Sequence, residues 1–364
     1  MLGNESEPGT SRSPSLPTMD KTLHSLEALA VLITTSINHV DSLTSTQNVE
    51  EQPLQALTDD YIKLTTLLRN ACTKLSLAMK PPASWDAAVA STAELEQKTN
   101  QFITCTSSFS PSHHGSVFTK AVRWETSSVL SALLALVRSL ISLASSKESD
   151  SKEYLLRTGS AHESLEKAAA TVRDMGDNLG AVRSRWAENQ SALDDALSEL
   201  GGIISGEDED EGWDELDLDF EGGKTGELTE VEKTRCEKVQ RLLRLTNLLH
   251  ARILSHRLRR EVVAAWPASR FDEILESSSN ILSTVDDLVS ALHPSHDLEV
   301  ISEATDEFIT SLEALTRIYS VAEEQSESAP SASAIKNAKW FQVCTEQINR
   351  EKEAVKVISR NTDG

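Results

Sequence analysis

Apolar side chains recur at alternating steps of three and four residues along most of this chain. This spacing places them on one face of an α-helix, and it does not match the two-residue repeat of a β-strand. The first such stripe consists of Leu23, Leu26, Ala30, Ile33, Ile37 and Val40. The pattern predicts an all-α fold in which each helix buries one face against its neighbours.

Residues that end helices interrupt the stripes. Pro81-Pro82 closes the second stripe, because proline cannot continue the hydrogen-bond ladder, and Ser84 is expected to cap the next helix. A later pattern over residues 151–200 is loosened at Gly176, where we expect a kink or break, and Gly201-Gly202 is expected to end it. Since the segments between breaks are about 25 residues long, they favour antiparallel bundles over one extended coiled coil.

A strongly acidic stretch separates two helical halves. Residues 207–221 contain ten carboxylates and no base. Because these charges repel and few apolar groups offset the entropy of ordering, we expect the free segment to be disordered. Its apolar residues are interleaved with acids, as in segments that dock an aromatic side chain into a groove. They form a hypothetical partner-binding site: Trp213, Leu216, Leu218 and Phe220. A solvated linker is the alternative interpretation.

The stripes and the acidic stretch together predict five regions. An N-terminal bundle of about five antiparallel helices is followed by an acidic disordered insert and a C-terminal helical region. The ranges are 1–19 for a disordered N-terminus, 20–200 for the bundle, 201–228 for the insert, 229–358 for the C-terminal helices and 359–364 for the tail. The two helical parts are compatible with one elongated body or with two.

The helix that follows the acidic stretch has a basic polar face. Thr229 and Glu232 have the spacing of a capping box, which marks its start. Between Lys233 and Arg260 there are nine bases and one acid, Glu237. We hypothesise that residues 207–221 fold back onto this face in the free protein, where they meet four arginines: Arg241, Arg244, Arg252 and Arg259. A solvated basic face is the alternative interpretation.

Charge and cysteine content limit the partners and the compartment. The formal net charge of −22 disfavours nucleic acid and anionic membranes as partners, since both would repel the chain. The four cysteines show no C-x-x-C spacing, and the first twenty residues lack the features of a signal peptide, which favours the cytoplasm and nucleus. No apolar run is expected to approach the length needed to span a bilayer. The oligomeric state is left open.

No catalytic, cofactor-binding or metal-binding pattern is found in the sequence. The chain contains no H-E-x-x-H, Gly-x-Ser-x-Gly, P-loop or glycine-rich dinucleotide motif, so we do not expect an enzyme. His113-His114 lies in a Ser/Pro/Gly segment without the spaced ligands that a tetrahedral metal site requires. Five tryptophans are expected to pack between helices: Trp85, Trp124, Trp186, Trp266 and Trp340.

One segment of the C-terminal half carries a family resemblance. Val285-Asp-Asp-Leu-Val289 leads into Ala291-Leu-His-Pro294, and it lies downstream of the acidic stretch and of a helix opened by Leu-Thr-Glu. This arrangement resembles the cyclin-D-interacting (GCIP) family, although His293 and Ser295 stand where the family pattern has tyrosine and a second proline. The resemblance implies an all-helical, non-enzymatic regulator. It implies binding to D-type cyclins or helix-loop-helix transcription factors, and a restraint on cell-cycle progression in the nucleus and cytoplasm.

The same segment supplies further candidate partner-binding residues, namely Asp286, Asp287 and Leu288. The two aspartates could pass for the paired acids of a hydrolase. However, adjacent helical residues point about 100° apart and seldom converge on one substrate atom. Contact with a partner, salt bridging or capping therefore suits them better.

Two other classes of protein are compatible with the sequence. A scaffold of the vinculin or talin rod type would use antiparallel bundles to link cytoskeletal elements, with the acidic stretch as a spacer. An acidic chaperone would use residues 207–221 to bind basic proteins such as histones. A pull-down with and without these residues separates the three classes by the partner that is retained or lost.

Overall fold

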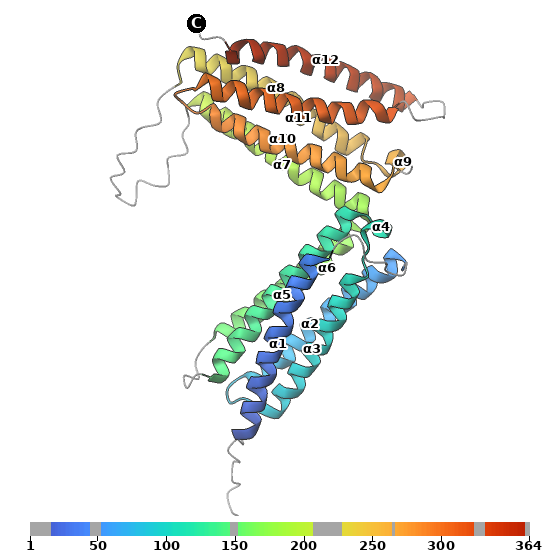
Figure 1. The fold of residues 1–364 in the computed structure, drawn as a ribbon, viewed down its shortest axis with the longest axis vertical. Coiled ribbons are helices and arrows are strands. Elements are labelled where there is room, and N and C mark those ends of the chain that lie inside the picture. The colour runs from blue at the N-terminus through green and yellow to red at the C-terminus, as the bar shows by residue number, and fades with distance from the viewer. Residues whose placement is uncertain are drawn as a thin grey trace, which may run out of the picture. The chain divides into compact units, whose positions relative to one another are not determined.

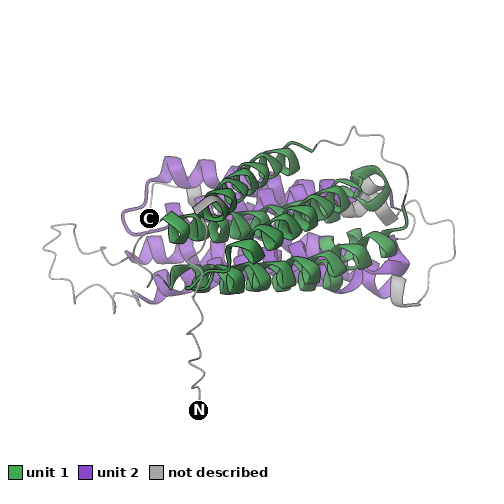
Figure 2. Cartoon of the chain, turned by 90° about the horizontal axis from the view of Figure 1, so that it is seen from below, with its two compact units in different colours: residues 1–181 green, residues 182–364 purple. Residues whose placement is uncertain are grey.

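The computed structural model describes residues 16–43, 52–145, 152–206, 228–263, 266–323 and 332–360. Every regular element in these ranges is an α-helix, which confirms the predicted all-α fold (Figure 1). The chain divides into two compact units, which we call unit 1 (residues 1–181) and unit 2 (residues 182–364) (Figure 2). The acidic residues 207–221 lie outside the described residues.

In its described part, unit 1 is a bundle of long helices with one short helix. These are α1 (Leu16–Ser42), α2 (Leu54–Met79), α3 (Trp85–Ser107), α4 (Pro111–His114), α5 (Ser116–Ser145) and α6 (Glu153–Met175). Neighbouring long helices pack in the order α1, α3, α2, α6, α5 and back to α1. This closed arrangement lets each helix bury its apolar stripe in a common core.

Aromatic side chains fill part of the unit 1 core. Tyr61 of α2 lies 4.8 Å from Phe102 and 6.2 Å from Phe109 between ring centroids, and Phe118 lies 5.9 Å from Phe109. All four side chains are fully buried. The Tyr61 hydroxyl is 3.2 Å from the hydroxyl of Thr126 on α5. The aromatic residues thereby join α2, α3 and α5 at one place.

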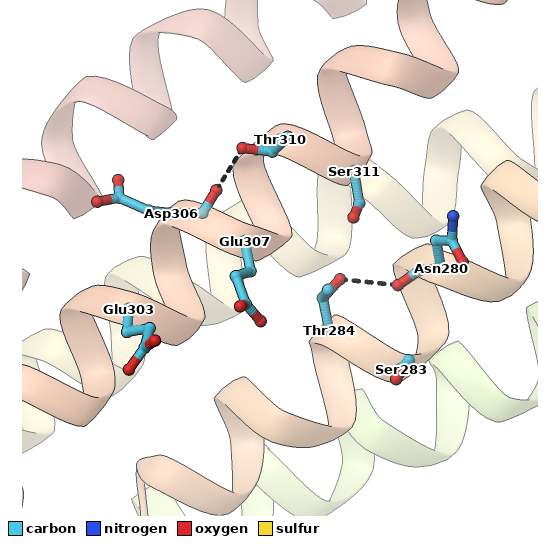
Figure 3. Close-up of a pocket in the computed structure, with 8 residues that line it drawn as sticks. All are labelled: Asn280, Ser283, Thr284, Glu303, Asp306, Glu307, Thr310 and Ser311. Atoms are coloured by element: carbon cyan, nitrogen blue, oxygen red, sulfur yellow. Dashed lines mark hydrogen bonds between the residues drawn. The ribbon is translucent and has the colours of Figure 1, made fainter.

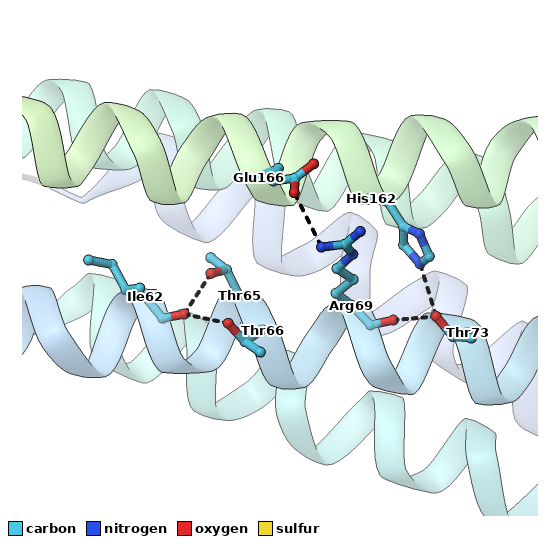
Figure 4. A network of polar contacts seen from close by, with 7 residues as sticks. All are labelled: Ile62, Thr65, Thr66, Arg69, Thr73, His162 and Glu166. Atoms are coloured by element: carbon cyan, nitrogen blue, oxygen red, sulfur yellow. Dashed lines mark hydrogen bonds and ion pairs between the residues drawn. The ribbon is translucent and has the colours of Figure 1, made fainter.

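Polar contacts connect α2 and α6 on the surface of unit 1 (Figure 4). The Arg69 guanidinium lies 3.2 Å from a Glu166 carboxylate oxygen, and the Thr73 hydroxyl lies 3.2 Å from Nε2 of His162. Arg69 contacts Glu166, and Thr73, which is later in α2, contacts His162, which is earlier in α6. The two helices are therefore antiparallel. Because the Arg69–Glu166 pair is largely exposed, we expect it to contribute little to stability.

Helix α5 is the most apolar helix of unit 1, and it corrects one expectation from the sequence. By length and composition alone it is long and apolar enough to cross a bilayer. Its residues Val129, Leu133, Leu136 and Leu140 are fully buried, and it contacts α1, α2, α3, α4 and α6. The apolar run is therefore accounted for by a central position in the bundle.

The described part of unit 2 is a second helical bundle. Besides most of α7 (Asn178–Ser205), it contains α8 (Glu230–His256), α9 (Arg260–Val263), α10 (Ala268–Ala291), α11 (Leu298–Glu323) and α12 (Ala332–Arg360). Helix α12 packs between α8 and α11, and α11 packs against α10. Helix α7 is tied to α8 and α10 by side chains: Trp186 Nε1–H donates to the His250 carbonyl (3.1 Å), and the Asn189 amide donates to Ser278 Oγ (2.9 Å).

The chain passes from unit 1 to unit 2 inside α7, which differs from the predicted bundle boundary at residue 200. The predicted break at Gly176 is confirmed: α6 ends at Met175, and Gly176 has a φ of +66°, which glycine adopts without steric cost. Beyond it, Trp186 is buried against His250 of α8, so residues 182–205 belong to the second core. Gly201-Gly202 does not end the helix, which continues to Ser205.

The predicted burial of the tryptophans holds for Trp186 and fails for Trp124. Trp186 is fully buried, whereas the Trp124 side chain is 72% exposed on α5. Val122, Thr126 and Val129 occupy the inward face of that helix, and Trp124 lies about 200° around the axis from Val122. The tryptophan therefore points to solvent because the core positions beside it are already filled.

Candidate protein-interaction surfaces

The start of α8 is fixed by the predicted capping box. The Thr229 hydroxyl accepts a hydrogen bond from the Glu232 backbone N–H (3.3 Å), and the Glu232 carboxylate accepts one from the Thr229 N–H (2.8 Å). The same carboxylate accepts the backbone N–H of His296 (2.9 Å), which connects the α10–α11 turn to α8. These hydrogen bonds lower the pKa of Glu232 to about 2, and the one from the His296 N–H has the largest effect. The capping box thus positions α8 beside the segment that follows α10.

The Val285–Val289 segment lies in the last turns of α10. Asp286 and Asp287 are exposed. Leu288 is fully buried, and Val285 and Val289 are almost fully buried. This corrects the assignment of Leu288 as a partner-binding residue. Leu288 follows Val285 by three residues on the apolar stripe, so it faces the core. Only the two aspartates of this segment are accessible to a partner.

An open, shallow groove lies between α10 and α11 (Figure 3). Hydroxyl, amide and carboxylate groups line it, from Asn280, Ser283, Thr284, Glu303, Asp306, Glu307, Thr310 and Ser311. Two hydroxyls are already used within their own helices, since Thr310 donates to the Asp306 carbonyl (2.8 Å) and Thr284 to the Asn280 carbonyl (3.0 Å). Exposed Glu303 and Glu307 lie four residues apart and face the same side of α11.

Of the two predicted aspartates, Asp287 lies on the side of the groove. It follows Ser283 by four residues and Thr284 by three, so it extends the exposed stripe that lines the groove. Asp286 lies about 100° around the helix from Asp287, at the margin of this stripe, since it follows Ser283 by three residues. The acidic edge of the groove, which we define as Asp287, Glu303 and Glu307, is suited to a cationic side chain of a partner.

The predicted basic face of α8 is divided in the structure. Arg241 and Arg244 are exposed. Arg252 instead contacts α12: its guanidinium donates to the Asn337 side-chain oxygen (2.6 Å) and lies 5.1 Å from the centroid of the Trp340 ring. Arg259 lies beyond α8 and pairs with Glu261 at 3.7 Å.

Another base of the same run is turned inward. Arg235 is 5% exposed, and its guanidinium donates to Nδ1 of His296 (2.7 Å). The sequence interpretation missed that α12 covers one end of the basic face. The adjacent aromatic residues Trp340 and Phe341 were the available signal, because arginines stack on exposed ring faces.

The other predicted sites lie outside the described residues or are structural. Trp213, Leu216, Leu218 and Phe220 fall in the acidic stretch, which is not described. His114 belongs to the short helix α4 and not to a loop, and its ring accepts the Ser110 N–H (3.0 Å) and lies 3.0 Å from the Gln52 carbonyl. Within the described ranges, no three histidine, cysteine or acidic side chains cluster so as to hold a metal ion.

The four cysteines are free thiols in the structure. Cys72, Cys236 and Cys344 are buried, and Cys105 is half-buried. Burial raises the pKa of Cys72 to about 12 and that of Cys236 to about 11. Because only the thiolate is a good nucleophile, these side chains act as small apolar groups in the two cores.

These features define an all-helical protein of two bundles whose exposed charged surfaces are suited to binding other proteins. Residues 60–206 match the family described as Grap2 and cyclin-D-interacting, N-terminal. This match supports the resemblance of the chain to the cyclin-D-interacting family. The matched range begins in α2 and ends with α7, directly before the acidic stretch.

A full-length similarity accompanies the family match. An uncharacterized protein of Schizosaccharomyces pombe is 25% identical to this chain over 320 residues. The aligned region covers 84% of this chain and 91% of that protein. The similarity therefore extends over both units and includes most of the residues that the family match leaves out.

Proposed function

We propose that this chain is a non-enzymatic regulator that acts by binding other proteins in the cytoplasm and nucleus. The partner classes are D-type cyclins and helix-loop-helix transcription factors, and the outcome of binding is restraint of cell-cycle progression. The family description of residues 60–206 supports a cyclin as partner. The observation that links the proposal to a particular surface is that Asp287, in the segment on which the resemblance rests, is exposed one helical turn beyond the groove-lining residues Ser283 and Thr284.

The chemistry of this groove favours a basic partner surface. Glu303 and Glu307 of its acidic edge line the groove together with Asp306, and the rest of the lining consists of hydroxyls and one amide. Carboxylates at an open edge steer a cationic partner and set its orientation, while the hydroxyls supply hydrogen bonds once water is displaced. A helix that presents lysine or arginine along one face is the partner element that fits best.

Binding of the purified chain to a D-type cyclin and to a helix-loop-helix domain, measured by calorimetry, tests the proposal. The variant Asp287→Lys with Glu307→Lys is expected to weaken binding by about tenfold, or ~1.4 kcal/mol. A matched control, Glu96→Lys with Asp195→Lys, changes the net charge equally at exposed positions of α3 and α7, which do not line the groove. We expect the control to bind within about twofold of the unmodified chain.

Equal weakening by both variants would show that only net charge matters and would remove the groove from the proposal. Absence of binding to either partner class would contradict the proposed function itself. Retention of histones in place of these partners, lost at high salt, would support an acidic chaperone, because non-specific charge attraction is screened by salt.

A further inference from the structure

The outer face of α8 carries a row of bases that ends at an exposed leucine. We call Lys238, Arg241, Arg244 and Leu248 the basic strip. Arg241 and Arg244 are exposed, Lys238 is half-buried, and the Leu248 side chain is 57% exposed. Their spacing of three, three and four residues keeps them on one side of the helix. A large aliphatic side chain beside exposed cations is a combination found at protein-binding surfaces.

The bases of this strip are not used by the bundle. Among the described residues, no acid pairs with Lys238, Arg241 or Arg244, although Glu237 is exposed on the same side of α8. Arg235 and Arg252 of the same helix are both engaged, with His296 and with Asn337 and Trp340. The fold therefore uses the two ends of the α8 basic run for packing and leaves the middle available to a ligand.

The chain itself contains a segment of complementary chemistry. Residues 207–221 combine ten carboxylates with four apolar side chains and no base. Its carboxylates can pair with the three bases of the strip, and one of its apolar side chains can contact Leu248. Without the ten carboxylates of the segment, the rest of the chain still has a net charge of −22 + 10 = −12, so an exposed basic strip is a favoured place for the segment.

The two helices that flank the segment bring it to the strip. An added Cβ atom at Gly201 of α7 would lie 3.6 Å from the side-chain nitrogen of Gln240, the residue before Arg241. Arg241 lies about 18 Å along the helix axis from Thr229, at 1.5 Å per residue. Residues 222–228 can span up to about 25 Å when extended, so the segment reaches the strip without leaving the unit.

We propose that the basic strip of α8 binds residues 207–221 of the same chain, with Arg241 and Arg244 pairing with its carboxylates and Leu248 contacting one of its apolar side chains. Intramolecular binding raises the local concentration of the segment, so weak individual pairs suffice. A partner that takes up the acidic segment must then release it from α8, which separates this surface from the groove between α10 and α11.

Carbodiimide cross-linking of the full chain, read by mass spectrometry, tests this proposal without any partner protein. The reagent joins a lysine amine to a carboxylate in direct contact. The variant Arg241→Lys with Arg244→Lys keeps the charge of the strip and adds two reactive amines. We expect both new lysines, and Lys238, to cross-link to residues 207–221 at low salt, with yields reduced by about tenfold at 1 M salt.

Charge reversal supplies the second arm. Arg241→Glu with Arg244→Glu is expected to reduce the Lys238 cross-link to this segment by about tenfold, because the segment is then repelled. The control Lys120→Glu with Arg138→Glu makes the same charge change on exposed positions of α5 in unit 1 and is expected to leave the yield within about twofold. Helix content, measured by circular dichroism, verifies that all variants are folded.

Two outcomes would overturn the proposal. Cross-links that form equally in the charge-reversed variant would show that the strip does not hold the segment. Mixing isotopically heavy and light chains would reveal the other: cross-links within one chain give no heavy–light pairs, so abundant heavy–light pairs would show that the occupant is the segment of a second copy. Since no cyclin or transcription factor is present, neither outcome bears on the proposed function.

Discussion

Unit 1 and unit 2 are both bundles of long helices, but the buried hydrogen-bond networks that join their helices are built from different groups. Unit 1 buries hydroxyls: Tyr61 and Thr106 lie 3.2 Å and 3.0 Å from Thr126, and the two threonines also bond backbone carbonyls one turn earlier. Unit 2 buries an imidazole, His250, between an indole and a serine. The hydroxyls of the first network stay neutral at neutral and acidic pH, whereas the second network contains an imidazole, a group that can take up a proton in acid.

The His250 network is fully connected in its neutral form. The ring stacks on Trp186 with centroids 4.8 Å apart, and Nδ1 lies 3.2 Å from the Thr246 carbonyl, to which it donates. Nε2 then accepts from the Ser278 hydroxyl (3.2 Å), and Ser278 accepts from the Asn189 amide (2.9 Å). The network joins α7, α8 and α10, so it holds together helices from either side of the acidic stretch. The contacts between helices in unit 2 therefore include the buried hydrogen bonds around His250, whereas those in unit 1 include the packed rings of Tyr61, Phe102 and Phe109.

The comparison is tested most strongly by a pair of tryptophans. Trp186→Ala removes a fully buried side chain that packs on His250, and we expect it to lower the stability of unit 2 by about 3–5 kcal/mol. Trp124→Ala removes a side chain that is 72% exposed, so unit 1 is expected to change by less than about 0.5 kcal/mol. Hydrogen exchange read by mass spectrometry measures the two units separately. Similar losses in both variants would contradict the assigned burial.

A smaller effect is expected from pH. Burial lowers the pKa of His250 from 6.5 to about 4, so between these values the unfolded chain binds a proton that folded unit 2 excludes. The contribution of neutral His250 is complete above pH 6.5 and is lost as the pH falls to about 4, by about 3 kcal/mol. Urea unfolding of unit 2 at a series of pH values measures this slope.

Two controls sharpen the pH prediction. His250→Gln removes the titration and keeps a hydrogen-bonding side chain, so the slope between pH 6.5 and 4 is expected to flatten. In unit 1, burial raises the pKa of Glu125, which is 7% exposed, so protonation as the pH falls favours its folded state. Half-exposed His162 has a lowered pKa, mainly through burial, and opposes this weakly from the surface. A steeper acid loss in unit 1 than in unit 2 would refute the contrast.

The smallest predicted difference concerns helix starts. Thr229→Ala removes a cap whose hydroxyl accepts the Glu232 N–H, and we expect a loss of about 1 kcal/mol in local stability at the start of α8. Ser84 occupies the N-cap position of α3 in unit 1, yet its side chain makes no capping hydrogen bond. Ser84→Ala is therefore expected to cost only a few tenths of that amount. Exchange rates of the first-turn amides in α8 and α3 compare the two.

Local features of the fold were predictable from the sequence because they depend on residues close together in the chain. The 3-4 spacing predicted the helices, Gly176 predicted the break before α7, and Thr229 with Glu232 predicted the capping box. The same spacing places Leu288 on the apolar stripe of Val285 and so predicts that it is buried. The prediction that Leu288 contacts a partner was wrong because helix periodicity, and not the Val-Asp-Asp-Leu-Val motif, sets the direction of this side chain.

The candidate surfaces were predictable only in part. The basic run of α8 is visible as nine bases between Lys233 and Arg260, yet which of them are accessible depends on α12. Arg252 meets Trp340 and Asn337, which follow it by more than eighty residues. Such long-range contacts leave no local spacing to read. The groove between α10 and α11 likewise exists only where two antiparallel helices pack side by side.

The sequence by itself determined that this chain is helical, where several of its helices begin or end, and that each helix buries an apolar face. Only the tertiary structure decided that residues 182–205 join the second unit, that Trp124 faces solvent, and which bases of α8 are left exposed. The physical reason is that periodicity specifies a face to be buried without specifying the neighbour that buries it. That choice is made by packing and by buried hydrogen bonds between helices far apart in the chain.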